Sequence, residues 1–144
     1  MKRLQQMAFP LLLAGLVGCG VTDAKPDAEA LASTYFSAAR SMSFDTISEL
    51  YGEQFYQQIS REEWERLLTR IWKKLGPPGK FELQAWRVNA VASTNGVGTY
   101  VVLQYAVSYE KYPVTETLTV FKPASGGPTR IVGHYINSTG LALE

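Results

Sequence analysis

The sequence predicts an α+β fold, in which N-terminal helices pack on a curled, four-stranded antiparallel sheet. Over residues 27–75, apolar side chains recur at three- and four-residue spacing, which is typical of helices with one buried face. From residue 81 onward they alternate with polar side chains, which is typical of strands. The alternating runs are joined by short connections, and short connections join antiparallel neighbours. We therefore expect one domain over residues 27–144.

Three helical segments are expected. Asp27 can cap the first helix, and Asp45 can open a short second helix that runs through Leu50. In the third, Ser60 and Glu63 form a capping box, and a Gly-Pro-Pro sequence follows the last turn. Six large apolar side chains make a single stripe along this third helix, at Trp64, Leu67, Leu68, Ile71, Trp72 and Leu75. Such a stripe predicts that one face of the helix is buried in the core.

Four alternating runs predict the strands of the sheet, at residues 81–91, 99–110, 114–122 and 130–137. They are separated by a turn at Asn95-Gly96, a corner at Pro113, and a loop rich in glycine and proline at 123–128. A strand of twelve residues would measure about 40 Å, which exceeds the width expected of a domain of this size. The sheet must therefore curl or contain bulges.

Helices followed by a long curled sheet resemble the α+β cone of the cystatin-like and ketosteroid-isomerase-like superfamilies. A narrower resemblance is to an uncharacterised family of small bacterial envelope proteins, and it covers most of residues 28–138. Four segments carry it: residues 64–76, Tyr100-Val101-Val102-Leu103-Gln104-Tyr105, Thr115-Glu116-Thr117 and Ile131-Val132-Gly133-His134-Tyr135. The chain departs from that pattern at Arg130, where an apolar or aromatic residue is expected. The resemblance implies a fold and an envelope location, and no activity.

The N-terminal residues predict where the protein resides. Lys2 and Arg3 precede an apolar run over residues 7–17, which is too short for a membrane-spanning helix of about 20 residues. The run ends in Leu16-Val17-Gly18-Cys19, which resembles the lipobox of bacterial lipoprotein precursors. The resemblance implies that residues 1–18 are removed as a signal peptide and that Cys19 is acylated, followed by a tether over residues 19–26. The alternative is an ordinary secretory signal with a cysteine at the cleavage site.

The residue after Cys19 refines the expected location. By analogy with Gram-negative lipoproteins, Gly20 in place of aspartate implies the outer membrane, with the domain facing the periplasm. Cys19 is also the only cysteine, so the domain is expected to depend on packing and not on disulfides. The expected partners are the bilayer, through acylated Cys19, and an envelope protein or a small apolar ligand.

Charge and composition argue against several other classes of function. Removal of Lys2 and Arg3 with the signal peptide leaves twelve basic residues of the fourteen, against thirteen acidic ones. A surface so close to neutral has no electrostatic footprint for nucleic acid. His134 is the only histidine and has no cysteine or acid cluster at ligand spacing, so no metal site is expected, and no sequence motif indicates a cofactor.

One carboxylate is expected inside the core. Glu116 shares a strand face with apolar neighbours on both sides, and an unpaired carboxylate there would be costly. Its possible partners are Tyr105, Arg87 and His134. Glu116 and Tyr105 could serve as a general base and a hydrogen-bond donor, as proton abstraction requires. The simpler interpretation is a structural glutamate that ties strands together.

The sequence therefore leaves more than one function open. We favour a membrane-anchored, non-catalytic binding domain, which should present uncovered aromatic side chains; the candidates are Trp86, Tyr100, Tyr109 and Tyr112. The alternative is a small isomerase or dehydratase with a closed pocket at Glu116. A purely structural envelope component would show neither a pocket nor an aromatic patch.

Overall fold

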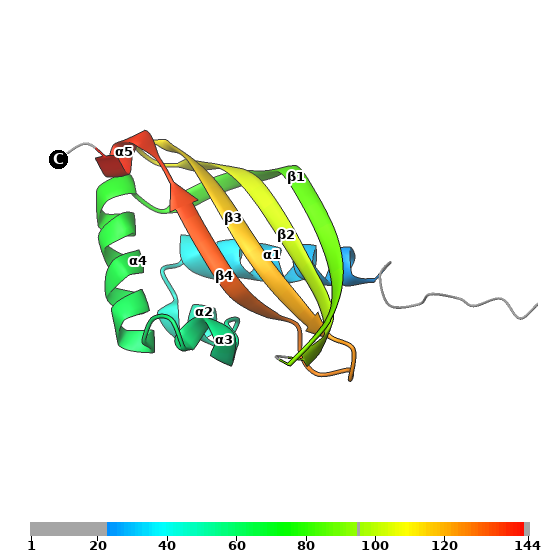
Figure 1. The fold of residues 1–144 in the computed structure, drawn as a ribbon. Coiled ribbons are helices and arrows are strands. Elements are labelled where there is room, and N and C mark those ends of the chain that lie inside the picture. The colour runs from blue at the N-terminus through cyan, green and yellow to red at the C-terminus, as the bar shows by residue number, and fades with distance from the viewer. Residues whose placement is uncertain (1–22, 95, 143–144) are drawn as a thin grey trace, which may run out of the picture.

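The computed structural model describes residues 23–94 and 96–142, in which helices cover one face of a curled antiparallel sheet. The predicted α+β class is confirmed (Figure 1). The elements are α1 (Ala24–Arg40), α2 (Phe44–Ser48), α3 (Glu53–Tyr56), α4 (Arg61–Leu75), β1 (Pro78–Ser93), β2 (Gly96–Tyr109), β3 (Pro113–Pro123), β4 (Arg130–Asn137) and α5 (Thr139–Ala142). Within the described residues, no helix is both long and apolar enough to span a membrane.

Helix α1 begins at Ala24 and not at Asp27, so the predicted helix start and the end of the predicted tether are corrected. Pro26 fits the first turn because its missing N–H would have no partner inside the helix. The backbone carbonyl of Asp23 accepts the N–H of Asp27 at 3.3 Å. The Asp27 carboxylate instead pairs with Lys122 at 2.5 Å, which joins the start of the helix to the end of β3.

Helix α4 is formed as the sequence predicts. The Ser60 hydroxyl accepts the backbone N–H of Glu63 at 3.2 Å, and Gly76 ends the helix with φ 80°. Five members of the predicted stripe are buried, whereas Leu67 is only partly buried. Figure 1 shows α4 standing beside the C-terminal end of β4. The half-covered Leu67 therefore lies where the helix faces the last strand and solvent.

The sheet is a meander with strand order β1-β2-β3-β4. Irregular pairing between Leu83 and Ala85, and again between Thr119 and Val120, introduces the bulges that a sheet of this strand length requires. The free side of β4 is covered in part by the segment after α2, because Tyr51 pairs in parallel with Ile131 and the Gly52 N–H donates to the Ile131 carbonyl at 2.9 Å. This contact brings a helical segment against the last strand.

The core lies between α1, α4 and the concave face of the sheet. Tyr35 and Phe36 of α1 are fully buried, and alanines elsewhere on this helix allow it to approach the strands closely. Phe36 stacks on Phe81 with ring centroids 4.4 Å apart and meets Tyr105 edge-on at 5.2 Å. These contacts tie α1 to β1 and β2.

The expected surplus of exposed aromatic side chains is only partly observed. Trp86 is 55% exposed, but Tyr109 is buried at 5%, so its expected exposure is wrong. Tyr100 and Tyr112 are partly buried. Tyr135, at 65%, is the exposed aromatic residue that the sequence pattern missed. Helix α5 was not predicted, because four residues are too few to show a helical period.

Candidate functional site

The core contains a chain of four hydrogen-bonded polar side chains, Tyr51, His134, Glu116 and Tyr109, which we call the Glu116 network. Glu116 is fully buried. Its Oε1 accepts a hydrogen bond from the Tyr109 hydroxyl at 2.5 Å, and its Oε2 lies 2.7 Å from His134 Nε2. His134 Nδ1 lies 2.7 Å from the Tyr51 hydroxyl.

One assignment of the His134 protons fits these partners. A neutral imidazole with its proton on Nε2 donates to Glu116, and its free Nδ1 accepts from the Tyr51 hydroxyl. Every hydrogen-bonding atom of the imidazole is then satisfied, and each carboxylate oxygen of Glu116 has a donor. The network is internally complete without any outside group.

Strand geometry explains how the four side chains meet. Alternation along β3 turns Glu116 to the concave face, and His134 of β4 lies opposite inward-facing Leu118 in the register. Tyr109 reaches Glu116 from the end of β2, whereas Tyr51 comes from the connection between α2 and α3. The network thus links three strands to a helical segment.

Aromatic rings enclose the imidazole of His134. Tyr35 meets it edge-on at 4.9 Å, Trp64 lies at 5.4 Å, and Tyr51 is nearly parallel to it, 6.2 Å between centroids. Its side chain is 0% exposed. Tyr35 Oη, Trp64 Nε1 and Trp72 Nε1 are also buried there, without a well-formed hydrogen bond in the described part of the chain.

Burial changes the acidity of the phenols in this cluster. It is the main cause that raises the pKa of Tyr35, Tyr51 and Tyr109 well above the usual value, and the Glu116 carboxylate raises each pKa further. Burial also raises the pKa of Tyr105 to about 12. The three phenols nearest Glu116 therefore stay neutral at ordinary pH, and those of Tyr51 and Tyr109 act as hydrogen-bond donors.

At alkaline pH, we expect the domain to lose stability through Tyr35, Tyr51 and Tyr109. Because their folded pKa values are raised, their contribution is complete below about pH 10, the unfolded pKa, and is lost as the pH rises toward the folded values. Three such groups lower the free energy of unfolding by about 4 kcal/mol per pH unit above pH 10. Tyrosinate absorbance should rise together with unfolding; ionisation of all tyrosines near pH 10 in a folded domain would contradict this burial.

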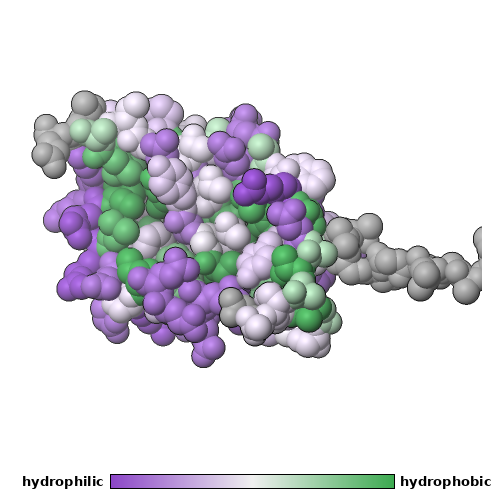
Figure 2. Space-filling model, in the orientation of Figure 1, coloured by the Kyte–Doolittle hydropathy of each residue, from purple (hydrophilic) through white to green (hydrophobic). Residues whose placement is uncertain are grey.

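An apolar groove lies on the surface next to the network, and we call it the α4–β4 groove. Its volume is about 380 Å³, and it is lined by Trp64, Leu67, Ile71, His134, Tyr135, Ile136 and Leu141. These side chains come from α4, β4 and α5. In Figure 2 a hydrophobic band is visible along the α4 side of the molecule. The network lies directly behind this groove, because His134 belongs to both.

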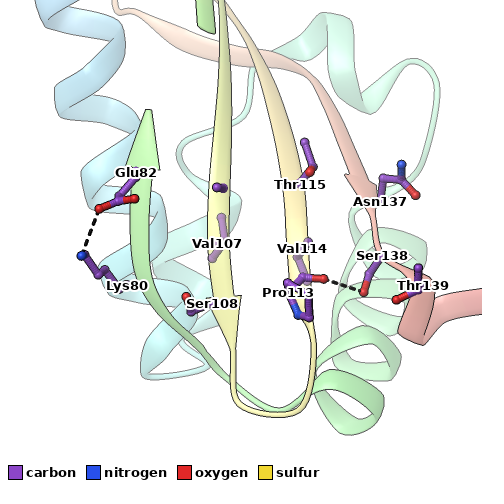
Figure 3. Close-up of a pocket in the computed structure, with 11 residues that line it drawn as sticks. Lys80, Glu82, Val107, Ser108, Pro113, Val114, Thr115, Asn137, Ser138 and Thr139 are labelled. Atoms are coloured by element: carbon purple, nitrogen blue, oxygen red, sulfur yellow. Dashed lines mark hydrogen bonds and ion pairs between the residues drawn. The ribbon is translucent and has the colours of Figure 1, made fainter. Parts of the chain in front are cut away.

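A second hollow, of similar volume, lies at the opposite face of the sheet and is lined by both polar and apolar residues (Figure 3). Its two charged residues, Lys80 and Glu82, are exposed and pair with each other at 3.0 Å. At its other side, the Ser138 hydroxyl donates to the Pro113 carbonyl at 2.9 Å. The charged side chains and the Ser138 hydroxyl therefore already have partners, and they lie at opposite sides of the hollow (Figure 3).

Comparison with known protein families identifies a match for most of this domain. Residues 31–134 match the model of a family described as protein of unknown function, DUF4019. The chain belongs to the DUF4019 family. No curated protein and no solved structure matches it. The matched part runs from α1 into β4 and includes all four residues of the Glu116 network.

The DUF4019 domain brings together some of the residues expected at its site and separates others. Glu116 and His134 meet in the network. Tyr105 lies opposite Glu116 in the register, but its ring packs against Phe36 and Phe81, and Tyr109 supplies the donor in its place.

Arg87 is not a partner of Glu116 in this DUF4019 domain, which corrects that expectation. The irregular pairing between Leu83 and Ala85 reverses which residues of β1 face inward. Arg87 consequently lies opposite Val102 and is exposed. A bulge of this kind leaves no mark in the alternation of the sequence.

Two residues of the network were missed by sequence reasoning. Tyr109 continues the inward face of β2 that contains Tyr105, so the alternation contained its signal. No sequence pattern indicated Tyr51, because its position depends on a helical connection packing on β4. Over the described ranges, 23–94 and 96–142, no group of three potential metal ligands is present. Cys19 and its lipobox-like segment lie outside these ranges.

Proposed function

We propose that this DUF4019 protein is a lipid-anchored lipoprotein of the bacterial envelope, and that its domain is a non-catalytic binding module. The ligand is an apolar segment of an envelope protein or a small apolar molecule, held in the α4–β4 groove. The observation that carries the proposal is this apolar groove with Tyr135, 65% exposed, at its side. An exposed aromatic residue beside an apolar groove is a common feature of binding surfaces.

The geometry of Glu116 favours binding over the isomerase or dehydratase alternative. A general base must reach the proton that it removes. Glu116 is 0% exposed, and both of its carboxylate oxygens already accept hydrogen bonds from Tyr109 and His134. A substrate would have to displace one of these donors inside the core. The network is better suited to hold β4, and with it one wall of the groove, in place.

The anchoring half of the proposal depends on Cys19. It is supported by the apolar run before Leu16-Val17-Gly18-Cys19 and by the absence of a second cysteine from the sequence. Several buried acyl chains hold a protein on a bilayer far more firmly than a single chain does. The outer membrane is the proposed location because Gly20 follows the cysteine.

Replacing Cys19 with serine is expected to abolish lipid attachment. Cells fed an alkyne-tagged fatty acid should label the wild-type protein and not Cys19→Ser. The variant should also leave the membrane fraction or stay as an uncleaved precursor. Wild-type protein without label, or equal labelling of the variant, would contradict the anchor.

A photoreactive amino acid at Tyr135 is expected to capture the groove's ligand in living cells. The matched control places the same group at Glu65, which is exposed on α4 away from the groove. We expect an adduct from position 135 and none from 65, and Leu67→Glu should suppress it because a charge would enter the apolar groove. Equal adducts at both positions, or insensitivity to Leu67→Glu, would contradict binding in the groove.

A further inference from the structure

One end of the domain combines the start of α1 with two strand connections. The start of α1 is held there by the pair of Asp27 with Lys122, the penultimate residue of β3. The two connections are joined to each other, because the Ala124 N–H donates to the Val97 carbonyl at 2.9 Å. We call this the α1 end of the sheet; it comprises the turn after β1, the loop after β3 and the first turn of α1. Figure 1 shows these segments together at one end of the strands.

The α1 end differs in chemistry from the opposite end. Residues 88–99 and residues 123–129 contain no acidic or basic side chain, so the charges at this end belong to the first turn of α1, with Lys25 and Asp27, and to the neighbouring Lys122. At the opposite end, the turn between β2 and β3 contains Glu110 and Lys111, and β1 begins with Lys80 and Glu82. Figure 2 shows hydrophobic surface at the α1 end as well. The two ends of the sheet are therefore suited to different surroundings.

Two large apolar side chains are exposed on this side of the domain: Val97 at the start of β2, and Trp86 in the middle of β1, where it lies beside Lys25 in the first turn of α1. Val97 is 59% exposed and Trp86 is 55% exposed. The Lys25 ammonium lies 5.0 Å from the centre of the Trp86 ring, and it also pairs with Glu29 at 2.8 Å. Tryptophan beside lysine is the combination favoured at the interface of a membrane, where the indole meets the headgroups and the ammonium reaches phosphate.

The chain between Cys19 and α1 is short, which limits how far the start of α1 can lie from a membrane that holds Cys19. Ala24, the first residue of α1, follows Cys19 by five positions. Five residues span at most about 18 Å when fully extended. If Cys19 is acylated, as the proposed function holds, the α1 end must remain within that distance of the headgroups. The opposite end of the sheet is separated from the α1 end by the length of β2.

We propose that the α1 end, with Trp86, Val97 and Lys25, is a contact surface for the phospholipid bilayer in which the Cys19 acyl chains are inserted. This inference depends on the proposed function for its anchor. The bilayer contact directs the opposite end of the sheet away from the membrane and limits rotation of the domain. Lys122 adds little to the contact, because it is already paired with Asp27.

Tryptophan fluorescence in vesicles tests the contact. The full acylated chain is reconstituted into vesicles of phosphatidylethanolamine and phosphatidylglycerol whose acyl chains are brominated, because bromine quenches indoles at short range. Trp64 and Trp72 are each 4% exposed and serve as internal references. We expect quenching of the wild-type protein, most of which is lost in Trp86→Phe. Quenching that is undiminished in Trp86→Phe would overturn the proposal.

The matched control moves the indole to the opposite end. In Trp86→Phe with Lys111→Trp, the new side chain sits at the exposed turn after β2, which is about 40 Å from Val97 and about 26 Å from Trp86 along the strands. No quenching is expected from position 111. Quenching there equal to that of wild type would mean that the domain has no fixed orientation, and would also overturn the proposal.

A chemically coupled chain separates this inference from the anchor. Cys19 is the only cysteine, so the full chain made without membranes can be joined at that residue to a maleimide-bearing lipid. Quenching of Trp86 in this coupled chain supports the contact surface even if labelling shows that cells do not acylate Cys19. An unquenched Trp86 in the coupled chain overturns the contact surface and leaves the acylation proposal standing.

Discussion

Replacing Glu116 with alanine is expected to lower the free energy of unfolding by about 2–6 kcal/mol, because each of the two buried donors that lose their acceptor costs about 1–3 kcal/mol. The change leaves the donors of His134 and Tyr109 buried without their acceptor. Urea denaturation followed by tryptophan fluorescence measures the loss, because Trp64 lies against His134 in the same cluster.

Two comparisons make this result specific. Glu65→Ala, on the exposed face of α4, should change stability by no more than about 0.5 kcal/mol. Glu116→Gln, which keeps one acceptor, should cost about 1–3 kcal/mol and is the measurable variant if alanine prevents folding. A Glu116→Gln protein as stable as the wild type would refute the network as a structural tie.

The same variant tests the choice between binding and catalysis. If the network holds β4 in place, Glu116→Gln should change stability more than it changes adduct formation at position 135. If Glu116 were a general base, the variant would keep its fold and lose turnover of a substrate. The full burial of Glu116 favours the first outcome.

Replacing Phe36 with alanine is expected to lower the free energy of unfolding by about 3–5 kcal/mol, the usual cost of truncating a buried aromatic side chain. Phe36 is 0% exposed and fills the space between Tyr35, Phe81 and Tyr105. Its loss would leave a cavity where α1 meets β1 and β2. Thermal or urea unfolding of the purified chain measures the change.

A neighbouring position on the same helix provides the control. Ser37 is exposed, so Ser37→Ala should shift stability by no more than about 0.5 kcal/mol. If Phe36→Ala cost as little as Ser37→Ala, α1 would not be docked on the sheet through this aromatic contact. The order of the two effects therefore tests the placement of α1 directly.

Local patterns predicted much of the fold because each is a property of one segment. Helix α4 has its capping box, its apolar stripe and its final glycine within one continuous stretch. Strands β2 and β3 appear as alternating runs because each has one buried face. The start of α1 was placed too late because Asp27 is a favoured capping residue, whereas the helix already begins at Ala24 and accommodates Pro26 in its first turn.

The candidate site was predictable only in part. Alternation along β3 was sufficient to place Glu116 inside the core. Its partners depend on register and on contacts between distant segments: Tyr51 and His134 lie 83 positions apart in the chain. The bulge in β1 removed Arg87 from the inner face, and α4, β4 and α5 form the groove only when they are packed together.

The sequence by itself determined the α+β class, the four strands, the α4 helix and the buried position of one carboxylate, because short-range periodicity and capping chemistry specify these features. Only the tertiary structure decided that Glu116 pairs with His134 and Tyr109, that Trp86 and Val97 remain uncovered, and that an apolar groove opens beside Tyr135. Those features arise from side chains far apart in the chain, whose meeting depends on strand register, bulges and helix docking.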